Sequence, residues 1–159
     1  MKTHLLWFRS DLRTADNPAL AQARNSADKV IAVYIHTPQQ DKQHHRGERQ
    51  RAFIAANLHM LEAKLRAADI EFQQLHCPDY SHCATTLRQF IQQHKIDGLF
   101  ANQEPGVNEA QRDRMVTEKT NIPFSISNGD CILQPGSVRT RQSAMFRVFT
   151  PFRKAWLAT

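Results

Sequence analysis

"KVIAVYI", residues 29–35, decides the fold, because this stretch is almost wholly apolar and rich in β-branched residues. Such a run is typical of a β-strand that is buried on both faces. "HLLWF", residues 4–8, has the same character and precedes it. Between them, Asp16 or Asn17 can cap a helix whose first residue is Pro18. The order strand, helix, strand indicates two parallel strands joined by a helical crossover.

The same alternation continues along the chain. Further strands are predicted at residues 70–76, 97–102 and 122–127, and helices at residues 48–68, 81–93 and 107–120. Ser81 is the expected cap of the second of these helices. The polar segment "HTPQQDKQHHRGERQ" is expected to be a surface loop. The pattern predicts an α/β fold, a Rossmann-like doubly wound five-stranded parallel sheet with helices on both faces.

Composition is that of an ordinary globular protein. The chain has 159 residues, of which 41% are hydrophobic and 23% charged, enough for one domain with a buried core. No apolar run approaches the roughly 20 residues that cross a bilayer. The apolar stretch near the N-terminus is too short for a signal peptide. We therefore expect a cytoplasmic protein.

The positive charge is concentrated at the end of the chain. The net charge is +6, and no Asp or Glu follows Asp130. The basic residues beyond that point are Arg139, Arg141, Arg147, Arg153 and Lys154. They account for all but one unit of the excess, so residues 1–130 are nearly balanced. The body of the protein therefore shows no obvious phosphate-binding field.

The segment "HCPDYSHC" contains four residues of types that ligate metals, namely His76, Cys77, His82 and Cys83. Its C-x5-C spacing does not match a zinc knuckle, and no second C-x-x-C or H-x3-H half is present. The end of a strand followed by the start of a helix explains the segment without a metal. Together with Cys131, these cysteines are odd in number and lack a C-x-x-C pair, which fits reduced, structural thiols.

The loop after the first strand, "WFRSDLRTADN", lacks the glycines of a dinucleotide-binding G-x-G-x-x-G turn. Instead Arg9, Asp11, Arg13 and Asp16 alternate in sign. This alternation predicts a loop that is held rigid by its own ion pairs. No nucleophile elbow, Walker loop or H-E-x-x-H motif occurs, so we expect no catalytic residues in this chain.

The loop after the fourth strand, "NQEPGVNEAQRD", has two interpretations. Asn108 is a good N-cap with Gln111 at N3, and Glu109 suits the positive end of the helix dipole. Alternatively, the carboxylate and the carboxamide project side by side into a cleft. The carboxylate could then accept the paired N–H donors of a pterin. By spacing alone the cap is favoured, because caps are common and ligand sites are few.

The end of the chain, "FRVFTPFRKAW", predicts a helix that begins at Thr150 and Pro151. Phe149, Phe152 and Trp156 recur at spacings of three and four, so they share one helical face. A face of this size requires a packing partner. Either this helix folds back on the residues that precede it, or its partner lies in sequence beyond this chain.

Three segments together resemble the amino-terminal, antenna-binding domain of the DNA photolyase/cryptochrome family: "LLWFRSDLRTADNPAL" (5–20), "VNEAQRD" (107–113) and "FRVFTPFRKAW" (146–156). The greatest similarity is to bacterial folate-type cyclobutane pyrimidine dimer photolyases, and it runs in order along essentially the whole chain. The resemblance implies an α/β antenna domain at residues 1–134. Residues 135–159 would then begin the connection to a helical FAD-binding domain that is absent from this chain.

The same resemblance assigns a cofactor site. Asn108 and Glu109 match the family positions that hold the pterin of 5,10-methenyltetrahydrofolate, so we expect both capping and ligand roles. The family's FAD, electron relay and DNA-binding surface lie in the helical domain. This chain departs from the family where Phe146 replaces a common tyrosine and where Asp41 and Lys42 replace more apolar residues.

The resemblance implies the light-harvesting domain of a deoxyribodipyrimidine photolyase, a carbon–carbon lyase that repairs UV-damaged DNA by electron transfer from reduced FAD. The pyrimidine dimer would be flipped out of the duplex first. We expect the full-length protein to be a monomer, and this chain alone to be inactive in repair and to bind folate weakly. Two alternatives are the amino-terminal domain of a cryptochrome photoreceptor and a free-standing nucleotide-binding module. The second would need a phosphate cradle, which the glycine-free first loop does not offer.

Overall fold

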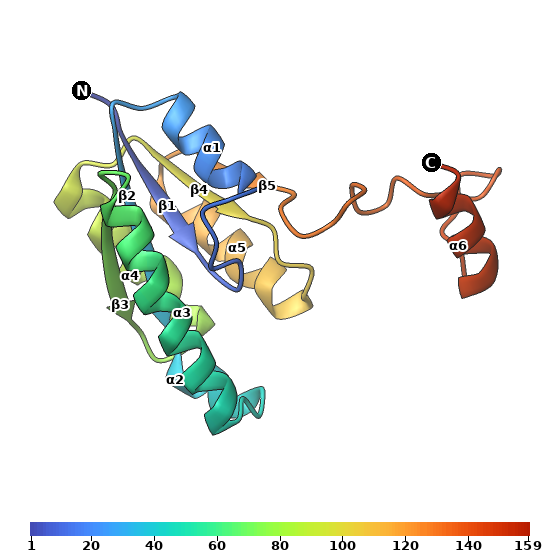
Figure 1. Cartoon of the computed structure of the whole chain (residues 1–159), viewed down its shortest axis with the longest axis horizontal. Helices are drawn as coiled ribbons and strands as arrows, with labels where there is room; N and C mark the ends of the chain where they lie inside the picture. The colour runs from blue at the N-terminus through green and yellow to red at the C-terminus, as the bar shows by residue number, and fades with distance from the viewer. The chain divides into compact units, whose positions relative to one another are not determined.

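A sheet of five parallel strands lies at the centre of the first part of the computed structural model, which describes residues 1–159 (Figure 1). The strands are β1 (Thr3–Phe8), β2 (Lys29–His36), β3 (Glu71–His76), β4 (Gly98–Asn102) and β5 (Phe124–Ser127). Their spatial order is β3-β2-β1-β4-β5. Leu5 of β1 lies opposite Ile31 of β2 on one side and Leu99 of β4 on the other. The predicted doubly wound sheet is confirmed, and its order reverses between β1 and β4.

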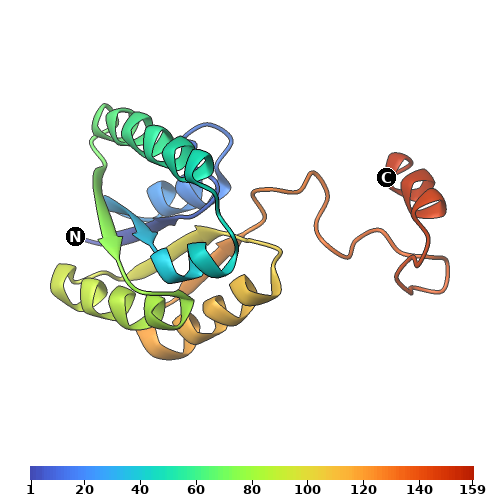
Figure 2. The same cartoon turned by 90° about the horizontal axis from the view of Figure 1, so that it is seen from below.

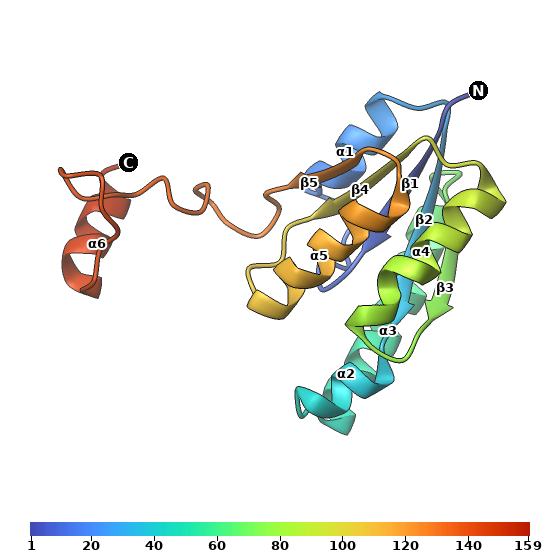
Figure 3. The ribbon, with the colours of Figure 1, turned by 180° about the vertical axis from the view of Figure 1, so that it is seen from behind.

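Helices cover both faces of this sheet. They are α1 (Pro18–Asn25), α2 (Pro38–Gln43), α3 (Glu48–Arg66), α4 (Tyr80–His94) and α5 (Val107–Thr120). Figure 2 shows α1 and α3 above the sheet and α4 and α5 below it, and Figure 3 shows the latter pair from behind. Leu5 and Trp7 pack into the core under α4, whereas Leu6 and Phe8 pack under α1 and α3. Alternate side chains of a strand point to opposite faces. The apolar first strand is therefore buried on both.

Residues 38–43 form a short helix, α2, where the sequence predicted a surface loop. Pro38 stands at its first position, where the missing N–H costs no hydrogen bond. Only Gln40 is buried in this helix. A helix so short and so polar has no periodic apolar face, which is why the prediction missed it.

Two of the predicted helix caps are wrong, each by two residues. The extended residue before α5 is Gly106, so Asn108 lies inside the first turn and caps nothing. The cap of α4 is Asp79, whose carboxylate accepts the N–H of Ser81. The predicted cap of α1, Asn17, is confirmed, because its side chain accepts the N–H of Leu20 at 3.0 Å.

The chain divides into two units, Met1–Gly129 and Asp130–Thr159, and the second contains α6 (Phe149–Leu157). This helix begins after Val148 rather than at Thr150, because a proline is tolerated anywhere in the first turn. The ring of Phe152 lies 6.0 Å from that of Phe146 and 6.4 Å from that of Phe149. The predicted domain boundary at residues 134 and 135 falls within this second unit. None of the helices is both long and apolar enough to cross a membrane.

Candidate functional site

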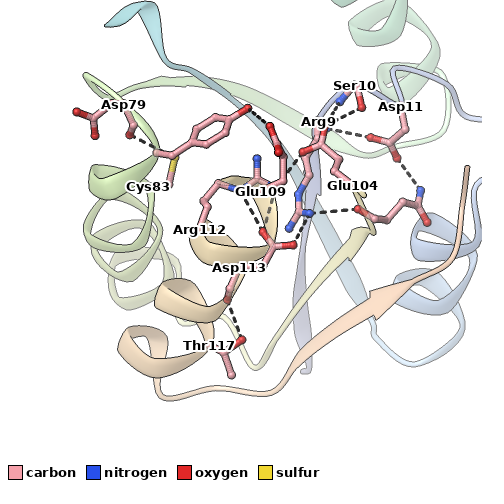
Figure 4. Close-up of polar contacts among 12 residues, drawn as sticks. Arg9, Ser10, Asp11, Asp79, Cys83, Glu104, Glu109, Arg112, Asp113 and Thr117 are labelled. Atoms are coloured by element: carbon pink, nitrogen blue, oxygen red, sulfur yellow. Dashed lines mark hydrogen bonds and ion pairs between the residues drawn. The ribbon is translucent and has the colours of Figure 1, made fainter. Parts of the chain in front are cut away.

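A buried ionic cluster lies at the carboxyl ends of β1 and β4, where the strand order reverses (Figure 4). It consists of Arg9, Glu104, Arg112 and Asp113, and we call it the Arg9 cluster. Asp113 accepts hydrogen bonds from Arg9 Nη1 at 2.8 Å and from Arg112 Nη2 at 2.9 Å. Arg112 Nη2 also donates to Glu104 Oε2 at 2.9 Å. Two cations thus face two anions, so the cluster is neutral as a unit.

Contrary to the prediction from the sequence, the ion pair of Arg9 lies outside the first loop. The carboxylate that pairs with Arg9 belongs to Asp113 of α5 rather than to Asp11 or Asp16. Asp11 instead accepts the backbone N–H of Arg9 at 3.0 Å and the amide of Asn102 at 2.6 Å. Tertiary contacts therefore hold the loop against β4 and α5. The partner of the Arg9 guanidinium lies far away in sequence.

Burial and charge act in opposite directions on the pKa values of this region. Burial favours neutral Glu104, but the Arg112 guanidinium and the hydrogen bond from Ser10 outweigh it, so its pKa is lowered. For Arg112, burial favours the neutral form, yet Asp113 and Glu104 raise its pKa. Burial raises the pKa of Asp11 despite its amide partners. Glu104 and Arg112 are thus held firmly charged.

Glu104→Gln is expected to weaken the dependence of the free energy of unfolding on pH in the acid range. Because the folded-state pKa of Glu104 is lowered, its carboxylate contributes stability above its unfolded pKa of about 4.3. That contribution is lost as the pH falls through the lower folded value. The difference in free energy of unfolding between wild type and variant should therefore be largest near neutral pH and shrink below about pH 4.

Urea unfolding followed by circular dichroism at a series of pH values measures this difference. Glu62→Gln is the matched control, because Glu62 pairs with Arg66 on an exposed face of α3. A constant difference between wild type and Glu104→Gln across the acid range would contradict the assignment.

A cavity of about 370 Å³ opens beside the Arg9 cluster. Its walls include Tyr34, Phe53 and Asn57 from β2 and α3, together with Arg9 and Tyr80. The Arg9 Nε and Nη2 atoms are buried without a hydrogen-bond partner. The guanidinium lies against Trp7 instead, with Cζ 4.3 Å from the centre of the ring system. The size and the mixture of aromatic and charged walls suit a small planar ligand.

A second cavity, of about 460 Å³, lies beside the predicted folate residue Asn108. Gln40, His44, Tyr80 and Gln111 also line it. His44 Nε2 lies 3.2 Å from the Asn108 amide nitrogen and 2.7 Å from the Gln40 amide nitrogen. The sequence treats His44 as a loop residue, but the structure places it at the end of α2, facing α5. Detecting this contact required knowledge of α2.

Glu109, the other predicted folate residue, is half-buried and turns toward α4. Its Oε1 accepts a hydrogen bond from the Tyr80 hydroxyl at 3.2 Å. Its Oε2 occupies the space that a Cβ at Gly106 would fill, so a side chain at this position would displace the Glu109 carboxylate. Burial, aided by the neighbouring carboxylates, raises the pKa of Tyr80, which therefore stays a hydroxyl donor. Sequence reasoning did not single out Tyr80, which lines both cavities.

No group of three or more His, Cys, Asp or Glu side chains is arranged to hold a metal ion. In the "HCPDYSHC" segment, His76 stacks on His36 with ring centres 4.5 Å apart. His82 contacts the carboxylate of Asp79 at 2.8 Å. The two histidines of this segment thus have separate partners.

Comparison with known proteins relates this chain to one family. A family model described as DNA photolyase matches residues 4–159. Deoxyribodipyrimidine photo-lyases of Salmonella typhimurium and Escherichia coli are 43% and 39% identical to it, each over 99% of this chain. The chain spans 34% of the length of each relative. A cryptochrome structure from Synechocystis sp. PCC6803 matches 100% of this chain and 34% of its own, with a TM-score of 0.85 and 20% identity, which shows the fold alone.

Proposed function

The chain belongs to the DNA photolyase family, and from this premise we propose that it is the folate-binding, light-harvesting domain of a deoxyribodipyrimidine photolyase. The observation that carries the proposal is 43% identity to such an enzyme over 99% of this chain. The chain spans only about a third of that relative. Repair of UV-induced pyrimidine dimers, the reduced FAD that drives it and the helical domain that holds the FAD in cis are therefore parts of the proposal.

The second cavity supports a folate site at Asn108, whereas Glu109 does not line this cavity but bonds to Tyr80, which does. Asn108 forms part of its wall and offers both an amide donor and an acceptor. The Glu109 carboxylate keeps acceptor capacity beyond its bond with Tyr80, because a carboxylate has about four lone-pair positions. It can accept paired N–H groups of a pterin with charge-assisted strength. When bound, 5,10-methenyltetrahydrofolate would supply near-ultraviolet absorption.

Glu109→Gln is expected to weaken folate binding. The amide replaces one acceptor oxygen by a donor and removes the charge, so two parallel N–H groups can no longer be accepted. Loss of a charged hydrogen bond costs about 1.5–3 kcal/mol, which raises Kd roughly 10- to 150-fold. Titration of the chain with 5,10-methenyltetrahydrofolate, followed by absorbance, measures the effect.

Two further variants separate binding from structure in this test. Glu118→Gln is the matched control on an exposed position of the same helix, and its Kd should equal that of the wild type. Tyr80→Phe removes the hydroxyl that contacts Glu109 but leaves the carboxylate charged. An unchanged Kd in Glu109→Gln would remove this residue from the proposed site.

The activity itself is tested on a protein that extends this chain into a flavin-binding domain. Under illumination, the flavin-loaded protein should restore dimer-containing oligonucleotides, whereas the present chain alone should not. A flavin-loaded protein without repair activity would reject the photolyase proposal in favour of a cryptochrome-type photoreceptor. The fold that this chain shares with a cryptochrome at 20% identity is compatible with the photoreceptor alternative.

A further inference from the structure

Two buried thiols face each other at the junction of β3 and α4. Cys77 directly follows β3, and Cys83 lies one turn into α4. Their sulfur atoms are 3.6 Å apart. Both also lie near the same acceptor, the backbone carbonyl oxygen of Asp79, at 3.3 Å from Cys77 Sγ and 3.7 Å from Cys83 Sγ. The two sulfur atoms therefore lie close to each other and to the same carbonyl oxygen.

The backbone around the thiols is fixed on both sides. The N–H of Cys77 donates to the carbonyl of His36 at 3.0 Å, which anchors the end of β3 to β2. The Asp79 carboxylate accepts the Ser81 N–H at 2.9 Å and its hydroxyl at 2.6 Å, which fixes the start of α4. An S–S bond of about 2.05 Å requires an approach of roughly 1.5 Å, which is within reach of small side-chain rotations.

The two thiols differ in reactivity and access. The hydrogen bond between the two thiols lowers the pKa of Cys77 and raises that of Cys83. Cys77 is therefore the thiol that more readily loses its proton to give the thiolate, the form that reacts with oxidants. Cys77 retains 7% exposure, and Cys83, although buried, is among the residues that line the first cavity. A small oxidant can thus reach the pair from solvent.

We propose that Cys77 and Cys83 form a reversible intramolecular disulfide when the protein meets hydrogen peroxide. The Cys77 thiolate attacks the peroxide, the O–O bond breaks, and sulfenic acid and hydroxide form. Cys83 then attacks the sulfenic sulfur and displaces the second oxygen as water. In sum, two thiols and one peroxide give one disulfide and two waters, so sulfur is oxidised and oxygen reduced. A dithiol reductant reverses the bond by exchange.

The disulfide would close the segment that carries Tyr80. This residue lies between the two cysteines, lines both cavities and donates to Glu109. Oxidation therefore constrains the wall that the two cavities share. The disulfide itself does not depend on what either cavity binds.

The test is alkylation of the whole native chain before and after peroxide, followed by digestion with trypsin. Residues 67–88 form one tryptic peptide that holds both cysteines, and residues 120–139 form another that holds Cys131. After oxidation, the first peptide is expected to lose two hydrogen atoms in mass and to resist alkylation. Treatment with dithiothreitol should restore two alkylation sites. Neither peptide contains methionine, so sulfoxide formation does not interfere.

Two controls make the outcome decisive. Cys131 is an exposed thiol in its own peptide, which cannot lose two hydrogens by internal disulfide formation. In Cys83→Ala, the sulfenic acid of Cys77 is no longer resolved, so dimedone should label the 67–88 peptide, whereas this peptide of the wild type should show no adduct. The proposal is overturned if the 67–88 peptide stays fully alkylatable while Cys131 is oxidised. It is equally overturned if dimedone labels the 67–88 peptide of the wild type and of Cys83→Ala alike.

Discussion

Arg112→Met is expected to lower the free energy of unfolding by about 3–5 kcal/mol, because it removes one partner from a buried ionic cluster. The Arg112 side chain is 3% exposed and pairs with both Asp113 and Glu104. Methionine keeps much of the side-chain volume but leaves two carboxylates with one cation between them. The guanidinium also lies 4.7 Å from the Trp7 ring and 4.8 Å from the Tyr80 ring, and these contacts are lost as well.

Urea unfolding at neutral pH measures this loss. Arg66→Met is the matched control, because Arg66 pairs with Glu62 on the surface with its side chain 79% exposed. Exposed pairs of this kind contribute about 0–1 kcal/mol. If Arg112→Met were no more destabilised than Arg66→Met, the Arg9 cluster would not be an interdependent unit.

Asn102→Ala is expected to cost about 2–4 kcal/mol, since it leaves several buried polar groups unsatisfied. Asn102, at the end of β4, is 1% exposed. Its amide donates to Asp11 at 2.6 Å and to Asn17 at 2.8 Å, and its oxygen accepts the N–H of Ala19 at 3.2 Å. One side chain thus joins β4 to the loop after β1 and to the start of α1. Without it, the Asp11 carboxylate stays buried with fewer donors.

Chemical denaturation of the purified variant provides the measurement. Asn57→Ala is the control, because the Asn57 amide donates only to the carbonyl of Phe53, one turn earlier on an exposed helix. A change within about 0.5 kcal/mol is expected there. Equal stability of the two variants would show that Asn102 does not organise the carboxyl ends of the strands.

The types of the longer elements could be predicted because they depend on local pattern. Residues 107–120 coincide with α5, and residues 29–35 lie within β2. The helix at residues 38–43 was missed because its stability comes from its position between β2 and α3, with Gln40 alone buried. Short polar helices have no periodic signal of their own.

Caps were less predictable than helices. Ser81 and Asn108 are both residues that favour N-caps, but each lies inside its helix. The cap is the residue whose backbone is still extended, and the path of the preceding loop selects it. Asp79 and Gly106 hold that place here.

Only some residues of the candidate site could be predicted from the sequence. Family resemblance indicated Asn108 and Glu109, whereas their contacts with His44 and Tyr80 were not predicted. Their contacts bridge 64 residues between His44 and Asn108 and 29 residues between Tyr80 and Glu109. No spacing within a single segment reports such pairs.

The order of apolar and polar residues was sufficient to determine a parallel α/β sheet, because backbone hydrogen bonding and side-chain periodicity act over a few neighbours. The ion pairs, in contrast, depend on the tertiary structure. Arg9 lies among acidic residues in its own loop, yet its ion pair is with Asp113, 104 residues further along. The reversal of strand order brings the end of β1 against β4 and α5. Because the ion pair is buried there, removal of one partner lowers the free energy of unfolding by several kcal/mol.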